Sequence, residues 1–599
     1  SIAASALPKI RSFGPRDLST TAWAFAACQF VHCTFVAVIA AAAIRTIKTL
    51  VPQGLANIAW SFSRLELPHA PLLHSISAAA LRRMSSFGAQ DISNLAWSMA
   101  TLRFPDTPLM ASLSSAARPR IRDFTPQGLG NPAWSCAVLS CRAAPLLDSI
   151  ASSARAMITV FRAQELANTA WAMAPLEWRD RPLLDAIASA AIRKSPHFDP
   201  RELAGLSWAL ATLKRRDAPL CASISAASRA KLSDFRAPEM ANTAWAYATL
   251  GFIDSPLLDA ISESAMRKLN VEGHSCEVAD VFSVVEAFAV AEKLDGALLR
   301  AAEAALRQRG GAVDSRCPQL PPCSDALNGQ PAPASAGCEG PRVLAAGTSL
   351  LALWKPPGWI VSVEDTAPRI VPAHGASECR GTPRLQDWVA TEFAGRWPIA
   401  ADAAASRGLL QRLDRETSGA VLWAGSYTAY YAARLQFAAR RVRKGYLCLC
   451  SGALPPPPRL FQQPLREVPA AGGRAAEARV SPLGRPACTE LAAAAHAIAG
   501  AGCCVSLASV RLHTGRLHQI RAHLADAGHP LVGDRVYRSN NAVAVCPRVF
   551  LHAAEAGVDA GGGPLLVALP LPEDLRTILH DVIPMDRRAV AFLGSRLAN

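Results

Sequence analysis

The sequence predicts a multidomain protein, an all-α solenoid of αα-hairpins followed by an α+β domain. A repeat with a fixed period of 37 residues predicts the first part. Short strand-like runs separated by turns, which begin at Val343, predict the second. The chain of 599 residues is also too long for one compact core. We therefore expect a solenoid over residues 1–306, a linker over 307–342 and a second domain over 343–599.

Tryptophans mark the repeat, and strings such as GLANIAW and ELANTAW surround them. Pro-Leu pairs and phenylalanines keep the same period, so three ladders indicate about seven stacked units. Each unit is predicted to hold two helices, because the tryptophan string has helical spacing and proline suits the first turn of the next helix. We expect each tryptophan to fill the layer between the helices. The tryptophans are Trp23, Trp60, Trp97, Trp134, Trp171, Trp208 and Trp245.

The repeat fades after Trp245, and residues 277–282 keep its shape without the tryptophan. We interpret that segment as a terminal capping unit of the array. Residues 308–342 are rich in Gly, Pro, Ser and Ala and show no period, which is typical of a flexible linker.

Basic residues recur at the end of each predicted second helix and would form a stripe along one edge of the array. Two interpretations stay open: these charges complement helix dipoles, or they contact RNA phosphates. Residues 1–250 carry 26 Lys and Arg against 15 Asp and Glu, a net charge of +11, which favours the phosphate contacts. The candidate residues are Arg45, Arg82, Arg83, Arg120, Arg193, Lys194 and Arg267.

The amino-acid composition indicates the kind of partner and the cellular compartment that this protein fits. The net charge of +15 favours an anionic partner such as nucleic acid. The 16 cysteines contain no CxxC pair, so neither a zinc site nor a disulfide framework is predicted, and a reduced intracellular compartment is expected. Residues 25–44 are apolar enough to suggest a membrane helix. The repeat explains that stretch better, so we expect no membrane association.

The second domain reads as strands that flank polar corners. The run LLALWKPPGWIVSV has a Lys-Pro-Pro-Gly corner, and LLQRLDRETSGAVLW has a corner that begins near Asp414. Residues 442–452 read as another strand, and 509–537 as a strand, a turn and a helix that starts near His518. Asp414 stands between Arg412 and Arg415, so its carboxylate is expected to be held in place. The spacing of His513 and His518 lacks a third ligand, and no metal site is predicted.

This half resembles the RluA-type pseudouridine synthases over about residues 345–580. The matching strings, in the family's order, are KPPGWIV, RLDRETSG, RKGYLCLCSG, GRPACTEL, HTGRLHQIRAHLADAGHPLVGD and FLHA. The resemblance implies that uridine in RNA is isomerised to pseudouridine on a mixed, largely antiparallel sheet, without a cofactor. The repeats resemble octotricopeptide-type helical repeats over about residues 8–306. That second resemblance implies binding of single-stranded RNA and favours a mitochondrion or plastid.

The chemistry of such a reaction agrees with the matched residues. Breaking an N-glycosidic bond and rejoining the sugar through carbon requires a flipped-out base and a carboxylate, which attacks either as a nucleophile or as the base that starts an elimination. The resemblance assigns the attack to Asp414, a pairing arginine to Arg521 and a stacking aromatic ring to Tyr446. An arginine beside a carboxylate keeps it ionised. Arg412 is predicted to displace the target base or to hold phosphate. Substrate contacts are also predicted at Lys355, Arg516 and His518, which would touch RNA or the residues around the site.

Several alternatives stay open at this stage. The domain could be a catalytically inactive RNA-binding or ribosome-assembly factor, and the repeats could bind protein instead of RNA. Ribosomal, transfer and messenger RNA are all compatible substrates, and cytoplasm or nucleus are compatible locations. We expect a monomer.

Overall fold

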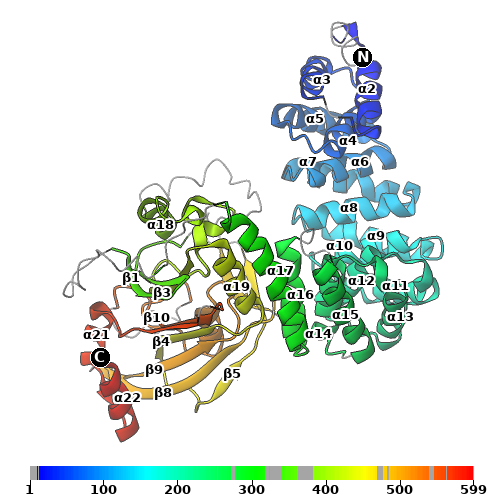
Figure 1. Ribbon diagram of the computed structural model, residues 1–599. Helices are drawn as coiled ribbons and strands as arrows, with labels where there is room; N and C mark the ends of the chain where they lie inside the picture. The colour runs from blue at the N-terminus through cyan, green and yellow to red at the C-terminus, as the bar shows by residue number, and fades with distance from the viewer. Residues whose placement is uncertain are drawn as a thin grey trace. The chain divides into compact units, whose positions relative to one another are not determined.

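The computed structural model divides into two compact units, Ser1–Ser264 and Ala265–Asn599 (Figure 1). This division differs from the predicted boundary at residue 306. Residues 317–322 and 324–339 of the predicted linker lie outside the described residues. The structure describes residues 10, 12–30, 32–252, 254–271, 277–316, 323, 340–361, 382–468, 476–481, 484–537, 546–561 and 563–597.

The first unit is a stack of helix pairs, as the period predicts. The first helices of the pairs contact each other in succession and form one layer, and the second helices form another (Figure 1). The first helices are α2 (Pro15–Ala27), α4 (Pro52–Arg64), α6 (Ala89–Thr101), α8 (Pro126–Val138), α10 (Ala163–Met173), α12 (Pro200–Thr212) and α14 (Ala237–Leu250). The second helices are α3 (Cys33–Thr46), α5 (Ala70–Arg83), α7 (Thr107–Ala117), α9 (Ala144–Met157), α11 (Arg181–Lys194), α13 (Ala218–Ala230) and α15 (Ser255–Val271), which continues past Ser264.

Local sequence explains where the second helices begin. The proline of each Pro-Leu pair lies in the first turn, where its missing N–H costs no hydrogen bond. An aspartate often precedes it as the N-cap: Asp180 accepts a hydrogen bond from the Leu183 N–H at 2.8 Å. The phenylalanine ladder then fills the core of each repeat, and all five rings are buried: Phe87, Phe124, Phe161, Phe198 and Phe235.

The tryptophans do not fill the layer between the helices, and that prediction was wrong. In α4 the buried residues include Leu55, Ile58 and Ala59, which form the packed face, whereas Trp60 lies only partly buried on another side. Trp23 remains 50% exposed. Neighbouring repeats instead stack their indole rings, with centroids 6.4 Å apart for the Trp23–Trp60 pair. Two further pairs of neighbouring repeats stack their rings in the same way, because the 37-residue period places the tryptophans at matching helix positions.

Part of the predicted basic stripe holds the repeats together. Arg83 and Arg120 donate to backbone carbonyls of the preceding repeat, and Arg120 Nη2 lies 2.7 Å from the Ser85 oxygen. Lys194 does the same, with its Nζ 3.0 Å from the Thr159 oxygen. These three side chains therefore satisfy carbonyls that follow a helix end. The remaining members of the stripe are exposed: Arg45, Arg82, Arg193 and Arg267.

The apolar stretch over residues 25–44 is divided between two helices. Helix α2 ends at Ala27 and α3 begins at Cys33, so the stretch belongs to one repeat. Within the described ranges, no helix has the length and apolar character needed to cross a membrane.

Helices α16 (Val278–Val290) and α17 (Gly296–Asp314) belong to the second unit and pack on α19 (Tyr427–Ala438). The Asp314 carboxylate accepts hydrogen bonds from the backbone N–H groups of Tyr427 and Thr428, at 2.9 and 3.0 Å. It thereby caps the N-terminus of α19, where unpaired N–H groups need acceptors. Residues 277–282, interpreted above as a capping unit of the array, thus fall in the second unit, and residues 307–314 are helical rather than linker.

The second unit is built on a mixed sheet, as predicted. Its strand order is β1-β2-β3-β10-β4-β9-β8-β12, with β11 paired to β10 and β5 to β8. The β3–β10 pair is parallel and the other pairs in this sheet are antiparallel. The bounds are β1 (Arg342–Ala346), β2 (Leu350–Lys355), β3 (Ser418–Ala424), β4 (Arg443–Ser451), β5 (Arg459–Phe461), β8 (Thr489–Ala499), β9 (Cys503–Leu512), β10 (Leu551–Asp559), β11 (Pro564–Ala568) and β12 (Ile583–Pro584).

Each face of this sheet carries its own core. Tyr446 and Cys448 of β4 face one cluster, whereas Leu447 and Leu449 face the other, as the alternation of a strand requires. The smaller elements of the unit are β6 (Leu465–Val468) paired with β7 (Glu477–Val480), and the helices α18 (Leu385–Phe393), α20 (Gln519–Asp526), α21 (Glu573–His580) and α22 (Arg587–Leu597).

Candidate active site

Asp414 lies on the loop that enters β3, and buried cations hold the backbone of that loop. Lys355, the last residue of β2, is opposite Gly419 of β3. Gly419 has a φ of +136°, and a Cβ there would lie 2.4 Å from the Ala553 oxygen, so only glycine fits. Lys355 Nζ donates to the carbonyls of Pro356, Arg415 and Thr417, at 2.8, 3.0 and 2.7 Å. Arg548 Nη1 donates to the carbonyl between them, that of Glu416, at 3.0 Å.

The Asp414 side chain meets a guanidinium that a second carboxylate holds in place. Arg521 Nη1, from α20, lies 3.2 Å from Asp414 Oδ2. The other edge of the same guanidinium forms a bidentate pair with Asp534, at 2.7 Å and 3.0 Å. Asp534 is fully buried, whereas the Asp414 side chain is 22% exposed. Asp414 is thus the carboxylate of the pair that a substrate can reach.

The opposite charges of Arg521 and of the two carboxylates, Asp414 and Asp534, stabilise one another. Burial raises the pKa of Asp534, but the hydrogen bonds and charge of Arg521 outweigh it and leave that pKa below its ordinary value. Burial opposes the charge of Arg521, and the two carboxylates reverse this effect and raise its pKa. Arg521 is therefore a fixed cation beside Asp414 over the whole physiological range.

Tyr446 contributes a neutral ring to the same face of the sheet. It projects from β4 into the core cluster on that face, and it is 8% exposed. Burial raises the pKa of its hydroxyl, and the negative charge of Asp414 raises it further. The phenol therefore stays protonated at neutral pH. Its interaction with the charge of Asp414 shows that the two side chains are neighbours.

His518 also lies beside the carboxylate. It is the N-cap of α20, and its φ of +47° places its backbone in the left-handed region at the start of that helix. Its Nε2 lies 3.9 Å from Asp414 Oδ2, and its Nδ1 lies 3.1 Å from the Tyr537 hydroxyl. Burial lowers the pKa of His518, although Asp414 opposes this effect. The ring of Tyr537 also packs 5.2 Å from the Arg521 guanidinium.

Comparisons with known proteins agree with this arrangement. Residues 350–526 match the family described as RNA pseudouridylate synthase, and this range contains Asp414, Tyr446 and Arg521. Residues 16–181 match the family described as RNA-editing substrate-binding complex 6 protein.

The C-terminal unit contains a pseudouridine synthase domain.

Among its relatives is an uncharacterized RNA pseudouridine synthase of Chloroflexus aurantiacus, 37% identical over 177 residues, which cover 29% of this chain and 53% of the relative. The dual-specificity RNA pseudouridine synthase RluA of Escherichia coli is 33% identical over 144 residues, 24% of this chain and 63% of the relative. A solved structure of human RNA pseudouridylate synthase domain containing 1 is 23% identical, with 44% of this chain and 98% of that chain covered and a TM-score of 0.32. The chain spans between about half and two thirds of the length of the curated relatives it matches.

The structure corrects the prediction that Lys355 contacts RNA in the synthase domain. Its side chain is buried, and its three hydrogen bonds go to backbone carbonyls of the chain itself. Burial, together with the charge of Arg548, lowers the pKa of Lys355 to about 7. Lys355 therefore shapes the loop that carries Asp414 and does not meet the substrate directly.

We expect the substitution Lys355→Met to destabilise the synthase domain and to reduce its activity. It leaves three carbonyls without their donor, at a cost of about 1–3 kcal/mol for each group that water cannot reach. Thermal unfolding and uridine conversion at a temperature well below the midpoint measure the two effects. Lys293→Met, at an exposed position of the same unit, is the matched control and should behave as the unmodified chain. Equal stability of the two variants would contradict this role.

The other side chains that were predicted to contact RNA differ in whether they are free to reach it. Arg412 is exposed two residues before Asp414 and can reach a bound strand. Arg516 is largely used within the domain: its Nε donates to the Pro486 carbonyl at 3.1 Å, and its Nη2 lies 3.8 Å from a Glu286 carboxylate oxygen. The structure therefore brings His518 and Arg521 to Asp414 and leaves Arg516 among protein groups.

The sequence alone did not identify the buried residues that hold the side chains of the site in place. Asp534 and His552 were visible only as parts of the strings that ended in GHPLVGD and FLHA, without a role. In the structure Arg548 Nη2 donates to Ser418 Oγ at 3.1 Å, and His552 Nδ1 lies 3.1 Å from that same oxygen. A buried polar group needs a partner, so an aspartate and a histidine within apolar strings were the signal that could have revealed this network.

Proposed function

We propose that this chain isomerises uridine in RNA to pseudouridine, with Asp414 as the attacking carboxylate. One observation carries the proposal: a partly exposed carboxylate lies 3.2 Å from a guanidinium that is locked by Asp534, inside a domain that matches pseudouridylate synthases. The relatives named as RNA pseudouridine synthases support the same reaction class.

Each residue of the site has a separate role in this reaction. The target uridine leaves its stack, and its ring packs on Tyr446. Attack by Asp414 frees the uracil by breaking the bond between N1 and C1′ of the ribose. The base turns, its C5 bonds to C1′, the carboxylate is released, and the C5 proton is replaced by a proton on N1. Arg521 stabilises the ionised carboxylate at the start and the end of this sequence.

The N-terminal repeats are proposed to hold the same RNA. Residues 1–250 carry a net charge of +11. A family described as an RNA-editing substrate-binding complex protein matches residues 16–181. A solenoid that binds the strand increases the time that a uridine spends near Asp414.

The loss of hydrogen from C5 provides the test. We expect the chain to release tritium into water from pooled RNA that contains [5-³H]uridine, while the RNA keeps its length. Pseudouridine mapping of the same RNA then identifies the position. RNA binding without tritium release from any fraction of total RNA would contradict the proposal and favour an inactive RNA-binding factor.

A further inference from the structure

The solvent-facing side of the first helices repeats three residue types. In α4 these are Gln53, Asn57 and Trp60, and their spacing of four and three residues places them on one helix face. The same three types recur at 37-residue steps in α6, α8 and α10, where none of them is buried. We call this surface the amide–indole stripe: Gln53, Asn57, Trp60, Gln90, Asn94, Trp97, Gln127, Asn131, Trp134, Gln164, Asn168 and Trp171.

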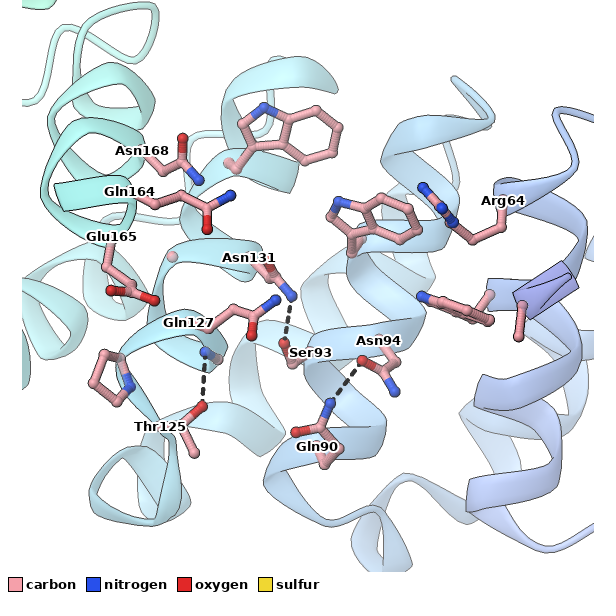
Figure 2. Close-up of a pocket in the computed structure, with 17 residues that line it drawn as sticks. Arg64, Gln90, Ser93, Asn94, Thr125, Gln127, Asn131, Gln164, Glu165 and Asn168 are labelled. Carbon is pink, nitrogen blue, oxygen red and sulfur yellow. Dashed lines mark hydrogen bonds between the residues drawn. The ribbon is translucent and has the colours of Figure 1, made fainter. Parts of the chain in front are cut away.

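Nine of the twelve residues of the stripe line a groove of about 560 Å³. Figure 2 shows glutamines and asparagines of neighbouring helices around this groove. Gln90 Nε2 lies 2.8 Å from Asn94 Oδ1, and Asn131 Nδ2 lies 3.0 Å from Ser93 Oγ (Figure 2). These contacts orient the amides within and between repeats. Trp60, Trp97 and Trp134 also line the groove.

We propose that the amide–indole stripe is the surface that binds single-stranded RNA, with unstacked bases against the indole edges and faces and base edges on the amides. Every base has an aromatic face, and an amide offers one donor side and one acceptor side. The four first helices α4, α6, α8 and α10 give one such set per repeat, which suits one nucleotide per repeat. The inference rests on the proposed function only in taking RNA as the ligand.

The lining of the groove favours RNA over a protein segment. Among the described residues that line it, there is no Leu, Ile, Val, Met or Phe, so most of its apolar surface belongs to flat indole rings, on which bases stack. Arg64 lies on the rim, and residues 1–250 carry a net charge of +11. By contrast, Arg83, Arg120 and Lys194 of the basic stripe already donate to carbonyls between repeats.

The test uses the full chain and a fluorescent RNA of eight nucleotides that contains no uridine. Such an RNA offers the synthase domain no target, so the result does not depend on catalysis. We expect Trp97→Ala combined with Trp134→Ala to weaken binding about tenfold or more in a fluorescence anisotropy titration. Gln127→Ala combined with Gln164→Ala should weaken it about threefold or more, and alanine at these exposed helical positions preserves the fold. Trp178→Ala, a half-buried tryptophan outside the stripe, is the matched control and should leave the affinity unchanged.

Each outcome decides the matter. Trp97→Phe combined with Trp134→Phe keeps two aromatic faces and should recover most of the affinity lost by the alanine pair. Unchanged affinity in both the tryptophan and the glutamine pairs would overturn the proposal. A loss confined to Arg82→Gln combined with Arg193→Gln would overturn it as well, and would move the RNA to the basic stripe. If binding fails but tritium release from uridine-containing RNA persists, the proposed function stands and this surface assignment falls.

Discussion

The substitution Asp414→Asn is expected to abolish pseudouridine formation, with a loss of about 10⁴-fold or more. The amide has nearly the same shape as the carboxylate, but it cannot attack carbon and carries no charge to pair with Arg521. The contact at 3.2 Å with Arg521 Nη1 is retained through the amide oxygen, so the loop should keep its position. Tritium release from [5-³H]uridine RNA measures the rate, and anisotropy measures RNA affinity, which we expect to persist.

Glu416→Gln is the matched control for this variant. Glu416 is in the same loop, its side chain is 45% exposed, and its nearest charged partner is the neighbouring Arg415 at 3.7 Å. The variant Glu416→Gln removes one negative charge, as Asp414→Asn does, but two residues away from Asp414. It should therefore retain turnover. Full activity in Asp414→Asn, or an equal loss in both variants, would reject Asp414 as the attacking group.

The second large effect is expected for Asp534→Asn, which removes one partner of a buried ion pair. The bidentate contact at 2.7 and 3.0 Å loses its charge, and Arg521 is left in a site from which most water is excluded. Breaking such a pair costs about 3–5 kcal/mol in the free energy of unfolding. Chemical denaturation measures that change.

Asp534→Asn should also slow catalysis in the molecules that remain folded. Arg521 then loses the group that aims it at Asp414, and a displacement of about 1 Å at a reacting group costs about 10²-fold. We expect kcat to fall while the KM for RNA changes little, because Asp534 is buried and touches no substrate. Asp526→Asn, at an exposed position of α20, is the control for both measurements. A rise in KM with unchanged kcat would show that Asp534 acts on binding instead.

The cations of the second unit differ most between their predicted and observed contacts. Lys355 and Arg516 were predicted to contact RNA or the residues around the site. The structure shows that Lys355 donates to three carbonyls and that Arg516 donates to another. A sequence records the charge of a side chain but not the acceptors that surround it, and these acceptors come from residues up to 62 positions away.

The tryptophan ladder illustrates the same limit. Its period correctly predicted stacked helix pairs, because only a repeated unit places identical residues at one spacing. Periodicity alone does not say which side of a helix faces the second layer. The positions of Leu55 and Ile58 decide that, and they leave Trp60 partly exposed beside the amides.

The sequence by itself determined the solenoid, the mixed sheet and the family strings that contain Asp414, Tyr446 and Arg521, because helical and strand periods and motif order are written along the chain. The tertiary structure alone decided which groups share an environment. It joined Arg521 to Asp534, placed α17 against α19 and brought nine residues of the amide–indole stripe to one groove. The physical reason is that pairing, burial and exposure depend on contacts between distant residues, and packing selects these contacts only when the whole unit has folded.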